Sequence, residues 1–361
     1  MLQNKKNYLS TAKGIGIIIM VMGHCGVPDL CCKFIYEFHM PLFFFCSGYF
    51  LKNIEKKDIL WDIFKKRFKN IYIKFVCWSL LFLTLHNLFF RLNIYNDIVL
   101  FRGQPSYLYN TSDFVNKAIR IITSMNEYEL LIRSFWFLKQ LFLACIIVST
   151  IIYTINRVTK YYHSHLIALL ILILLTFISK LQNWSIPAIW DISLVFMSSS
   201  FYLSGYIFKK YDILNKLHNL YVSIVCLSLL LVGLFILPWT NMLEYTTESM
   251  LPFFITAYSG TILTLNISRK LETSKLKNLF YYLGQNTMVI FALHMLCFKI
   301  GNLIKITIYD MPIYRLADFQ IIKEHNSHFW IVYTIIGISI PLLFDYIMKN
   351  RYTHRIWSFF V

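Results

Sequence analysis

The chain alternates between long apolar segments and short polar ones. Ten apolar segments approach the length of about 20 residues that a helix needs to cross a hydrocarbon core. They are 11–27, 34–51, 71–91, 134–155, 165–181, 188–208, 219–238, 250–267, 279–300 and 328–348. This pattern predicts an all-α polytopic membrane protein with about ten transmembrane helices. We expect residues 1–361 to form a single integral-membrane domain without an appended soluble domain.

Basic residues are concentrated in alternate loops. Most of the 35 Lys and Arg residues lie before the first segment, in the loops after segments two, four, six and eight, and after the last segment. Because Lys and Arg are enriched in cytoplasmic loops, this bias predicts that both chain ends are cytoplasmic. The longest polar stretch, 92–133, then lies on the outer side.

Composition supports the membrane interpretation. The chain is 57% hydrophobic and 15% charged, whereas soluble domains carry about 25% charged residues. The net charge of +17 would suit nucleic acid, but the basic residues fall in short runs between apolar segments, so we expect a lipid bilayer and no nucleic acid as partner. The eight cysteines are scattered without metal-ligand spacing, so no metal site is predicted. The oligomeric state is left open.

Segment 34–51, FIYEFHMPLFFFCSGYFL, carries polar groups inside an apolar run. Ionisable side chains within a span are costly and usually functional. His39, close to Pro41, is therefore a candidate site residue, with a packing role beside a proline kink as the alternative. Glu37 is interpreted as an interfacial acid.

The first segment contains a second histidine, His24, 11 residues after Lys13. At 1.5 Å per residue this is roughly 16 Å along a helix, so His24 lies beyond the bilayer centre if Lys13 marks the inner interface. A neutral imidazole there can accept a proton from a hydroxyl group. The alternative is a histidine bonded to a neighbouring helix. His39 enters its segment from the outer side, so the two rings are expected at similar depth and could converge.

The strongest basic cluster follows segment two and includes Lys66, Arg67 and Lys69. Positive-inside anchoring explains part of it. The alternative is a site for phosphate groups, which guanidinium and ammonium groups bind through charge-assisted hydrogen bonds.

Several blocks resemble the membrane acyltransferase 3 family. Residues 38–49 read FHMPLFFFCSGY, close to the second-helix motif of that family, and residues 13–24 resemble its first-helix segment ending in histidine. Residues 283–294, LGQNTMVIFALH, resemble a further motif, and 135–138 and 202–206 resemble two weaker ones. Within the family the chain is similar to the fucose 4-O-acetylase-like enzymes of cell-surface polysaccharide pathways.

The resemblance implies an O-acetyltransferase in a bacterial-type cytoplasmic membrane. Its donor substrate would be cytoplasmic acetyl-CoA, with no permanently bound cofactor, and its acceptor a carbohydrate hydroxyl. By this resemblance His24 is the catalytic base and His39 orients it or shares its proton. Residues that would bind the phosphates of acyl-CoA are Lys13, Lys66, Arg67 and Lys69. Residues that would bind substrate are Trp136, Asn286 and His294.

One departure concerns the R-x-x-R motif of the family, whose second arginine is replaced here by Asn70. The sequence leaves open which residue supplies that charge, which sugar and acyl chain are used, and whether transfer is direct. Two other classes of membrane protein also fit part of the pattern. A proton-coupled transporter or flippase predicts inverted repeats, and none is visible. A structural subunit would use its polar groups only for helix packing.

Overall fold

The computed structural model describes residues 7–159, 161, 163–186, 191–349 and 357–361, and over this part of the chain the regular structure is helical. The α-helices are α1 (Asn7–Gly23), α2 (Asp29–Tyr36), α3 (His39–Tyr49), α4 (Lys57–Arg67), α5 (Lys74–Arg91), α6 (Thr111–Ser124), α7 (Trp136–Val158), α8 (Ser164–Leu181), α9 (Ile192–Lys210), α10 (Ile213–Leu217), α11 (Leu220–Ile236), α12 (Thr247–Leu271), α13 (Lys277–Gln285), α14 (Thr287–Tyr309) and α15 (Phe329–Lys349). A π-helical stretch, η2 (Phe68–Ile73), joins α4 to α5, and the 3₁₀ helices η3 (Leu130–Phe135) and η4 (Ile313–Ala317) precede α7 and α15.

Each predicted apolar segment overlaps one or more helices of the described residues, which confirms the all-helical class. Within the described residues, six helical stretches are long and apolar enough to cross a membrane: Lys57–Arg91, Leu130–Val158, Ser164–Leu181, Thr247–Leu271, Thr287–Tyr309 and Phe329–Lys349. Helix α11 is apolar but shorter. The start of predicted segment 188–208 lies outside the described residues. The number of ten spans and the orientation stay predictions.

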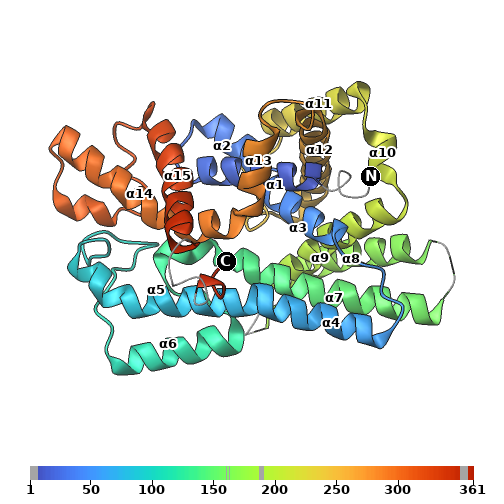
Figure 1. Ribbon diagram of the computed structural model, residues 1–361, viewed down its shortest axis with the longest axis horizontal. Helices are drawn as coiled ribbons and strands as arrows, with labels where there is room; N and C mark the ends of the chain where they lie inside the picture. The colour runs from blue at the N-terminus through green and yellow to red at the C-terminus, as the bar shows by residue number, and fades with distance from the viewer. Residues whose placement is uncertain (1–6, 160, 162, 187–190, 350–356) are drawn as a thin grey trace. The chain divides into compact units, whose positions relative to one another are not determined.

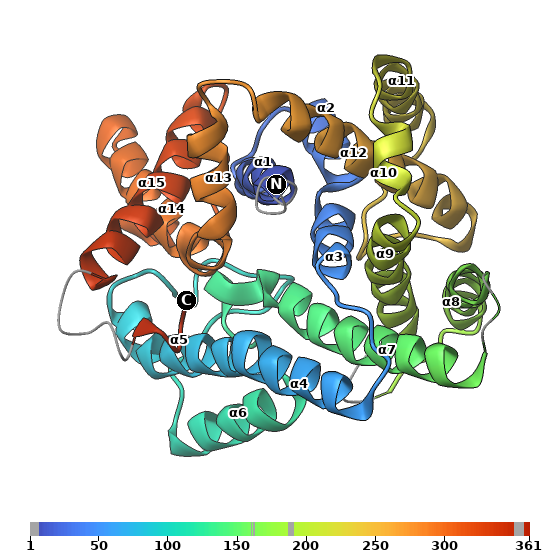
Figure 2. The same ribbon diagram turned by 45° about the vertical axis from the view of Figure 1, so that its right-hand side comes forward.

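The chain divides into two compact units, each built from separate stretches of sequence. Unit 1 comprises Met1–Ile19, Lys33–Ile71 and Phe137–Gln285, and unit 2 comprises Met20–Cys32, Tyr72–Trp136 and Asn286–Val361. In unit 1, α9 packs against both α3 and α8, and α11 packs against α12. In unit 2, α14 packs against α15 and α5 packs against α6, as Figures 1 and 2 show.

The crossing of α3 and α9 in unit 1 depends on two glycines. A Cβ atom on Gly48 would lie 1.7 Å from the carbonyl oxygen of Tyr202, and one on Gly205 would lie 2.0 Å from that of Phe45. Small residues let helix backbones approach closely, which is a main source of helix association in membranes. The Ser-Gly-Tyr elements of the second and sixth predicted segments are therefore packing partners.

A second close approach in unit 1 joins α1 to α13. A Cβ atom on Gly14 would lie 2.0 Å from the carbonyl oxygen of Phe280, and one on Gly284 would lie 1.8 Å from that of Ser10. Gln285 adds a hydrogen bond from Nε2 to the Ser10 hydroxyl. The LGQN block thus packs on the helix that carries Lys13.

Two predicted segments are broken rather than continuous. Segment 34–51 is interrupted at Glu37 and Phe38, between α2 and α3. Pro41 then stands in the first turn of α3, where its missing N–H has no helical partner to lose. Segment 279–300 is interrupted at Asn286, whose φ and ψ of −105° and 22° separate α13 from α14. Glu37, interpreted as an interfacial acid, is only 2% exposed and is therefore buried within the protein, and its depth in the membrane stays a prediction.

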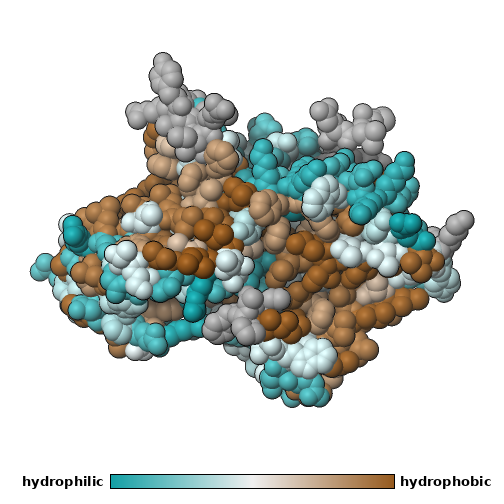
Figure 3. All heavy atoms as spheres, turned by 90° about the horizontal axis from the view of Figure 1, so that it is seen from below, coloured by the Kyte–Doolittle hydropathy of each residue, from teal (hydrophilic) through white to brown (hydrophobic). Residues whose placement is uncertain are grey.

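Large apolar side chains are exposed along several of these helices. On α8 and α11 they include Leu170, Leu174, Leu231, Phe235 and Ile236. Figure 3 shows hydrophobic side chains over much of the face in view, with hydrophilic ones gathered in patches. Such surface is stable against lipid and costly in water.

Candidate active site

Two histidines that are far apart in the sequence meet in unit 2. His24 directly follows the last residue of α1, and His294 lies about two turns into α14. Their ring centroids are 5.4 Å apart, with an angle of 31° between the ring planes. His294 is completely buried, whereas His24 is half-buried. The structure therefore forms a histidine pair, which we define as His24 and His294.

The ring of His294 is fixed by the backbone of its own helix. Its Nδ1 atom lies 3.1 Å from the carbonyl oxygen of Ile290 and 2.9 Å from that of Phe291. Among the described residues, none is hydrogen-bonded to its Nε2 atom, although that atom is buried. A buried polar atom without a partner is uncommon and calls for a functional explanation.

The ring of His24 is contacted by a residue near the other end of the chain. The side-chain nitrogen Nε2 of Gln320 lies 2.7 Å from His24 Nδ1. Gln320 belongs to the segment between α14 and α15, residues 310–328, which we call the outer segment because the predicted topology places it outside. Its φ of +62° marks a local turn.

Three buried side chains of α14 hold the backbone of the outer segment. Lys299 Nζ donates to the carbonyl oxygens of Leu316 and Asp318, at 3.0 and 2.7 Å. Lys305 Nζ donates to the carbonyl oxygen of Ile322 at 2.8 Å.

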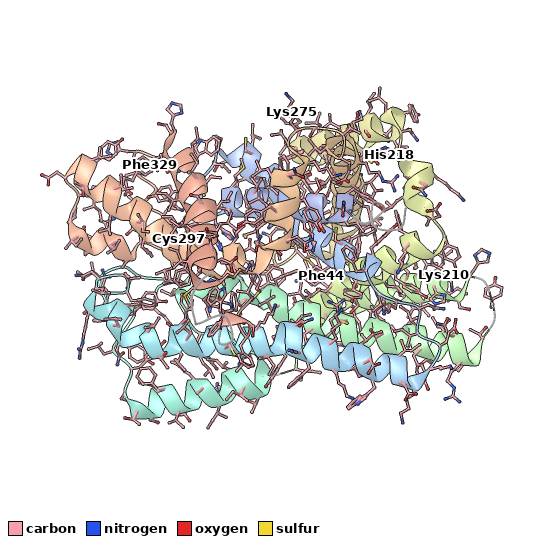
Figure 4. The ribbon with its side chains drawn as sticks, viewed as in Figure 1. Phe44, Lys210, His218, Lys275, Cys297 and Phe329 are labelled. Atoms are coloured by element: carbon pink, nitrogen blue, oxygen red, sulfur yellow. The ribbon has the colours of Figure 1, made fainter. Side chains whose placement is uncertain are left out.

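Asn302 is the third of these side chains, and we call Lys299, Asn302 and Lys305 together the ladder. Asn302 Oδ1 accepts from the backbone N–H of Ile322 at 3.2 Å and from the Tyr333 hydroxyl on α15 at 2.7 Å. Asn326 also ties the outer segment to the turn after His24, because its Nδ2 donates to the carbonyl oxygens of Cys25 and Gly26. Figure 4 labels Cys297 on α14 and Phe329 at the start of α15, the helices that precede and follow the outer segment in the chain.

The predicted phosphate-binding residues lie in unit 1. Arg67, at the end of α4, is half-buried and donates to the Tyr202 hydroxyl of α9 at 3.3 Å. Lys13 lies near enough to Arg67 for the two positive charges to repel each other, and its Nζ lies 5.5 Å from the centroid of the Phe50 ring. Lys66 and Lys69 are exposed. The structure thus brings Lys13 to Arg67 and leaves Lys66 and Lys69 at the surface.

A polar cavity of about 430 Å³ lies further along the same face of α9. Tyr206 and Lys210 follow Tyr202 at intervals of four residues and therefore share its side of the helix. Tyr206 donates to Asn53, and Lys210, labelled in Figure 4, donates to His165. The cavity is lined by Asn53, Glu55, Ile155, Asn156, Thr159, Tyr161, His165 and Lys210.

The remaining candidate residues occupy separate surroundings. His39 is buried in unit 1, with its Nδ1 2.9 Å from the carbonyl oxygen of Ile35 and its ring against Tyr36. Its convergence with His24 stays a prediction, because the two residues belong to different units. Trp136 is half-buried at the start of α7. Asn286 precedes α14, and its Oδ1 accepts from Lys349 Nζ at 3.2 Å, so an interhelical hydrogen bond uses at least part of this amide.

Comparison with known proteins settles the family. The model of a protein family described as an acyltransferase domain matches residues 6–346, nearly the whole chain. The chain belongs to the acyltransferase 3 family. Its apolar helices and this membership make it an integral membrane acyltransferase. No curated protein and no solved structure matches it.

Sequence reasoning missed Gln320, Lys299 and Lys305 as neighbours of the histidine pair and of the outer segment. Gln320 lies in a polar stretch without periodicity, so nothing marked it. Lys299 lies inside predicted segment 279–300, and the rule that ionisable residues within spans are functional could have found it.

Proposed function

We propose that this acyltransferase moves an acetyl or other short acyl group from acyl-CoA to a hydroxyl group of a cell-surface or lipid-linked glycan. The observation that carries the proposal is the histidine pair, formed by the two motif histidines of an acyltransferase 3 chain. Acyl transfer to a hydroxyl needs a group that accepts the hydroxyl proton, and imidazole is the side chain suited to this near neutral pH.

The donor is proposed to bind in unit 1. Coenzyme A is an anionic thiol carrier, and Arg67, held by Tyr202 and backed by Lys13, offers a positioned guanidinium for one of its phosphates. The polar cavity along α9 has room for further polar parts of the donor. Lys66 and Lys69 are exposed, so they add positive electrostatic potential that attracts the phosphates rather than fixed hydrogen bonds.

The acceptor is proposed to react at the histidine pair. The acceptor oxygen attacks the thioester carbonyl carbon while its proton passes to a ring nitrogen. The carbon–sulfur bond then breaks, and the departing thiolate takes up a proton, which gives the ester and free coenzyme A. Under the predicted topology, in a bacterial-type cytoplasmic membrane, the donor comes from the cytoplasm and the acceptor from the outer side.

The test is glycan analysis by mass spectrometry of host cells with and without the gene. Cells that express the wild-type chain should carry glycans heavier by the mass of one acyl group, and cells that express His24→Ala should not. Purified protein should bind acetyl-CoA. A protein that neither binds acyl-CoA nor changes any glycan would disprove the proposal and favour a transporter or a structural subunit.

A further inference from the structure

We propose that Arg102 and Arg133 form a binding site for a phosphate group of the acceptor, beside the histidine pair. The acceptor is then a glycan that is still joined to a phosphate, as in a lipid-linked precursor, rather than a finished polysaccharide. The identity of this ligand rests on the proposed function, whereas the site itself rests on contacts within unit 2.

The two guanidinium groups share one aromatic ring. The Cζ atom of Arg102 lies 5.6 Å from the centroid of the Phe101 ring, and that of Arg133 lies 5.3 Å from it. The two charges are near enough to repel each other. An aromatic ring attracts a cation, but a second cation at the same ring adds a repulsion that a bound anion removes. Guanidinium groups bind phosphate oxygens through charge-assisted hydrogen bonds, so the pair suits a phosphate.

Neither of these arginines is neutralised by an ion pair within the part of the chain that the structure describes. Glu127 lies near enough to Arg133 to attract it, but not at ion-pair distance. By contrast, Arg315 of the outer segment is paired with two carboxylates. The charges of Arg102 and Arg133 are therefore available to a ligand.

Both arginines are carried by ordered backbone. Phe101 and Gln104 exchange two main-chain hydrogen bonds, of 2.9 and 3.1 Å, around a two-residue loop. The loop residues Arg102 and Gly103 have φ values of 51° and 79°, and positive φ at both central positions is typical of a type I′ turn. Arg133 belongs to the 3₁₀ helix η3. Because the backbone is already ordered, ligand binding costs less conformational entropy.

A first set of contacts connects this site to His24. The ring of Phe101, which both arginines share, lies against that of Phe319, with centroids 4.4 Å apart. The next residue in the chain is Gln320, whose side chain contacts His24. The ring at the arginine site therefore packs on the outer segment directly next to the partner of His24.

A second set of contacts connects the site to His294. Phe135, two residues after Arg133, stacks on Phe291 of α14, with centroids 5.3 Å apart and 8° between the ring planes. The Phe291 ring in turn lies 6.4 Å from that of His294. The arginine site thus borders both members of the histidine pair, and a sugar joined to a phosphate at this site is held beside the pair.

Positive-inside anchoring does not explain these two arginines. Under the predicted topology, Arg102 lies in the outer stretch 92–133 and Arg133 at the outer end of predicted segment 134–155. Basic residues that set the orientation lie on the cytoplasmic side. A phosphate at the outer membrane surface has two sources, the acceptor and the bilayer phospholipids. We assign the acceptor because the site borders the histidine pair, where a phospholipid has no reaction to undergo.

Phosphate binding can be measured without any acyl transfer. The full-length protein in phosphatidylcholine nanodiscs is titrated with a polyprenyl phosphate, with the polyprenol that lacks the phosphate, and with phosphatidylglycerol. We expect the polyprenyl phosphate to bind about tenfold more tightly than either of the others, or better. Equal affinity for the polyprenol would show that the phosphate is not recognised. Equal affinity for phosphatidylglycerol would make this a phospholipid site. Either result would overturn the proposal.

The residues are tested by removing one charge at a time. Arg102→Gln should weaken the binding of polyprenyl phosphate about tenfold, because a charged hydrogen-bond donor is lost. Arg133→Gln should act in the same direction, and Arg133→Lys, which keeps the charge, should retain part of the affinity. Arg120→Gln, the same exchange at an exposed position of α6, is the matched control and should bind as the wild type does. Because Arg102 is exposed, unchanged affinity in Arg102→Gln would overturn the proposal whether or not Arg133→Gln folds.

The affinity for acyl-CoA separates the phosphate of the acceptor from those of the donor. It should be unchanged in Arg102→Gln, while the KM for the acceptor rises. An equal loss of acyl-CoA affinity would show that the two arginines bind the donor and would overturn the proposal.

Failure of this site and failure of the proposed function give different results. A wild-type protein that binds polyprenyl phosphate but transfers no acyl group would disprove the proposed function and leave the phosphate site in place. Acyl transfer with wild-type affinity for polyprenyl phosphate in the Arg102 and Arg133 variants would disprove the phosphate site and leave the proposed function in place.

Discussion

Gly48 and Gly205 face each other's helices so closely that neither position has room for a methyl group. A Cβ atom at Gly48 would lie 1.7 Å from a backbone oxygen of α9, and one at Gly205 would lie 2.0 Å from a backbone oxygen of α3. Both obstacles are main-chain atoms, so no rotamer change relieves them. The contact fixes α3, which carries His39, against α9, which carries Tyr202.

Replacing Gly48 by Ala should therefore force the two helices apart. Overpacking a tight contact costs about 1–3 kcal/mol, and loss of the close approach adds to this. We expect a clearly lower melting temperature in detergent, with the same result for Gly205→Ala. Thr150→Ala, at an exposed position of α7, is the control. Wild-type stability in both glycine variants would show that the helices separate at no cost.

The helices could be predicted from the sequence, whereas the neighbours of the candidate site residues could not. Apolar length alone located the helices, because a membrane span has to be apolar whatever it packs against. The breaks before His39 and at Asn286 were missed because they depend on tertiary contacts. The meeting of His24 with His294 was missed because a helical pattern gives each ring a face but not a neighbour. Gln320 was missed because loops carry no periodic signal.

Replacement of His24 by Ala should abolish transfer. A positioned proton-handling group contributes about 10²–10⁴-fold to rate, and His24→Ala should lose at least this much kcat while acetyl-CoA binding persists. The double variant with His294→Ala should lose less than the product of the two single losses, because the rings act as a unit. His39→Ala is expected to be damaging with residual activity. Near wild-type transfer by a folded His24→Ala protein would disprove the catalytic role proposed for His24.

Replacement of Arg67 by Ala should weaken the donor site. A hydrogen bond to a charged group is worth about 1.5–3 kcal/mol, which is roughly a tenfold to hundredfold rise in the KM for acyl-CoA. The value of kcat should change little, since phosphate contacts bind ground and transition states alike. Adding Lys66→Ala or Lys69→Ala should weaken binding further. Lys57→Ala, at an exposed position of α4, is the control. Unchanged donor affinity in the double variants would show that these cations do not bind acyl-CoA and serve only to set the orientation of the chain in the membrane.

Sidedness can be tested by cysteine labelling in intact cells. Because Cys31 is exposed, it is first replaced by Ser. An impermeant maleimide should label Ser112→Cys and should label Asp58→Cys and Lys275→Cys only after the membrane is opened. The reverse pattern would overturn the predicted orientation and the sides assigned to donor and acceptor.

The outer stretch 92–133 contains a buried acid whose protonation should affect stability. Glu129 Oε2 lies 2.8 Å from Nδ1 of His86, whose Nε2 lies 3.0 Å from the carbonyl oxygen of Tyr107. Burial raises the pKa of Glu129 above its ordinary value. The folded state therefore binds this proton more tightly than the unfolded state, and its stability falls as pH rises from about 4 towards the raised pKa.

The neutral isostere Glu129→Gln should remove that dependence. The difference in melting temperature between Glu129→Gln and wild type should grow with pH over this range and then become constant. A difference that stays the same at every pH would show that Glu129 does not titrate with a raised pKa.

The side chains of Lys299, Asn302 and Lys305 on α14 bind the outer segment mainly at its main chain. They contact the carbonyl oxygens of Leu316, Asp318 and Ile322 and one N–H group, and Lys305 also donates to the side chain of Asn326. Almost any residue supplies main-chain groups, so the exposed side chains of this segment, Ile313, Tyr314 and Lys323, are free to change without loss of these contacts. The buried Leu316 and Ile322 are not. Under the proposed function, exchange of the exposed side chains, with Gln320 retained, is the natural place to redirect acceptor preference by directed evolution.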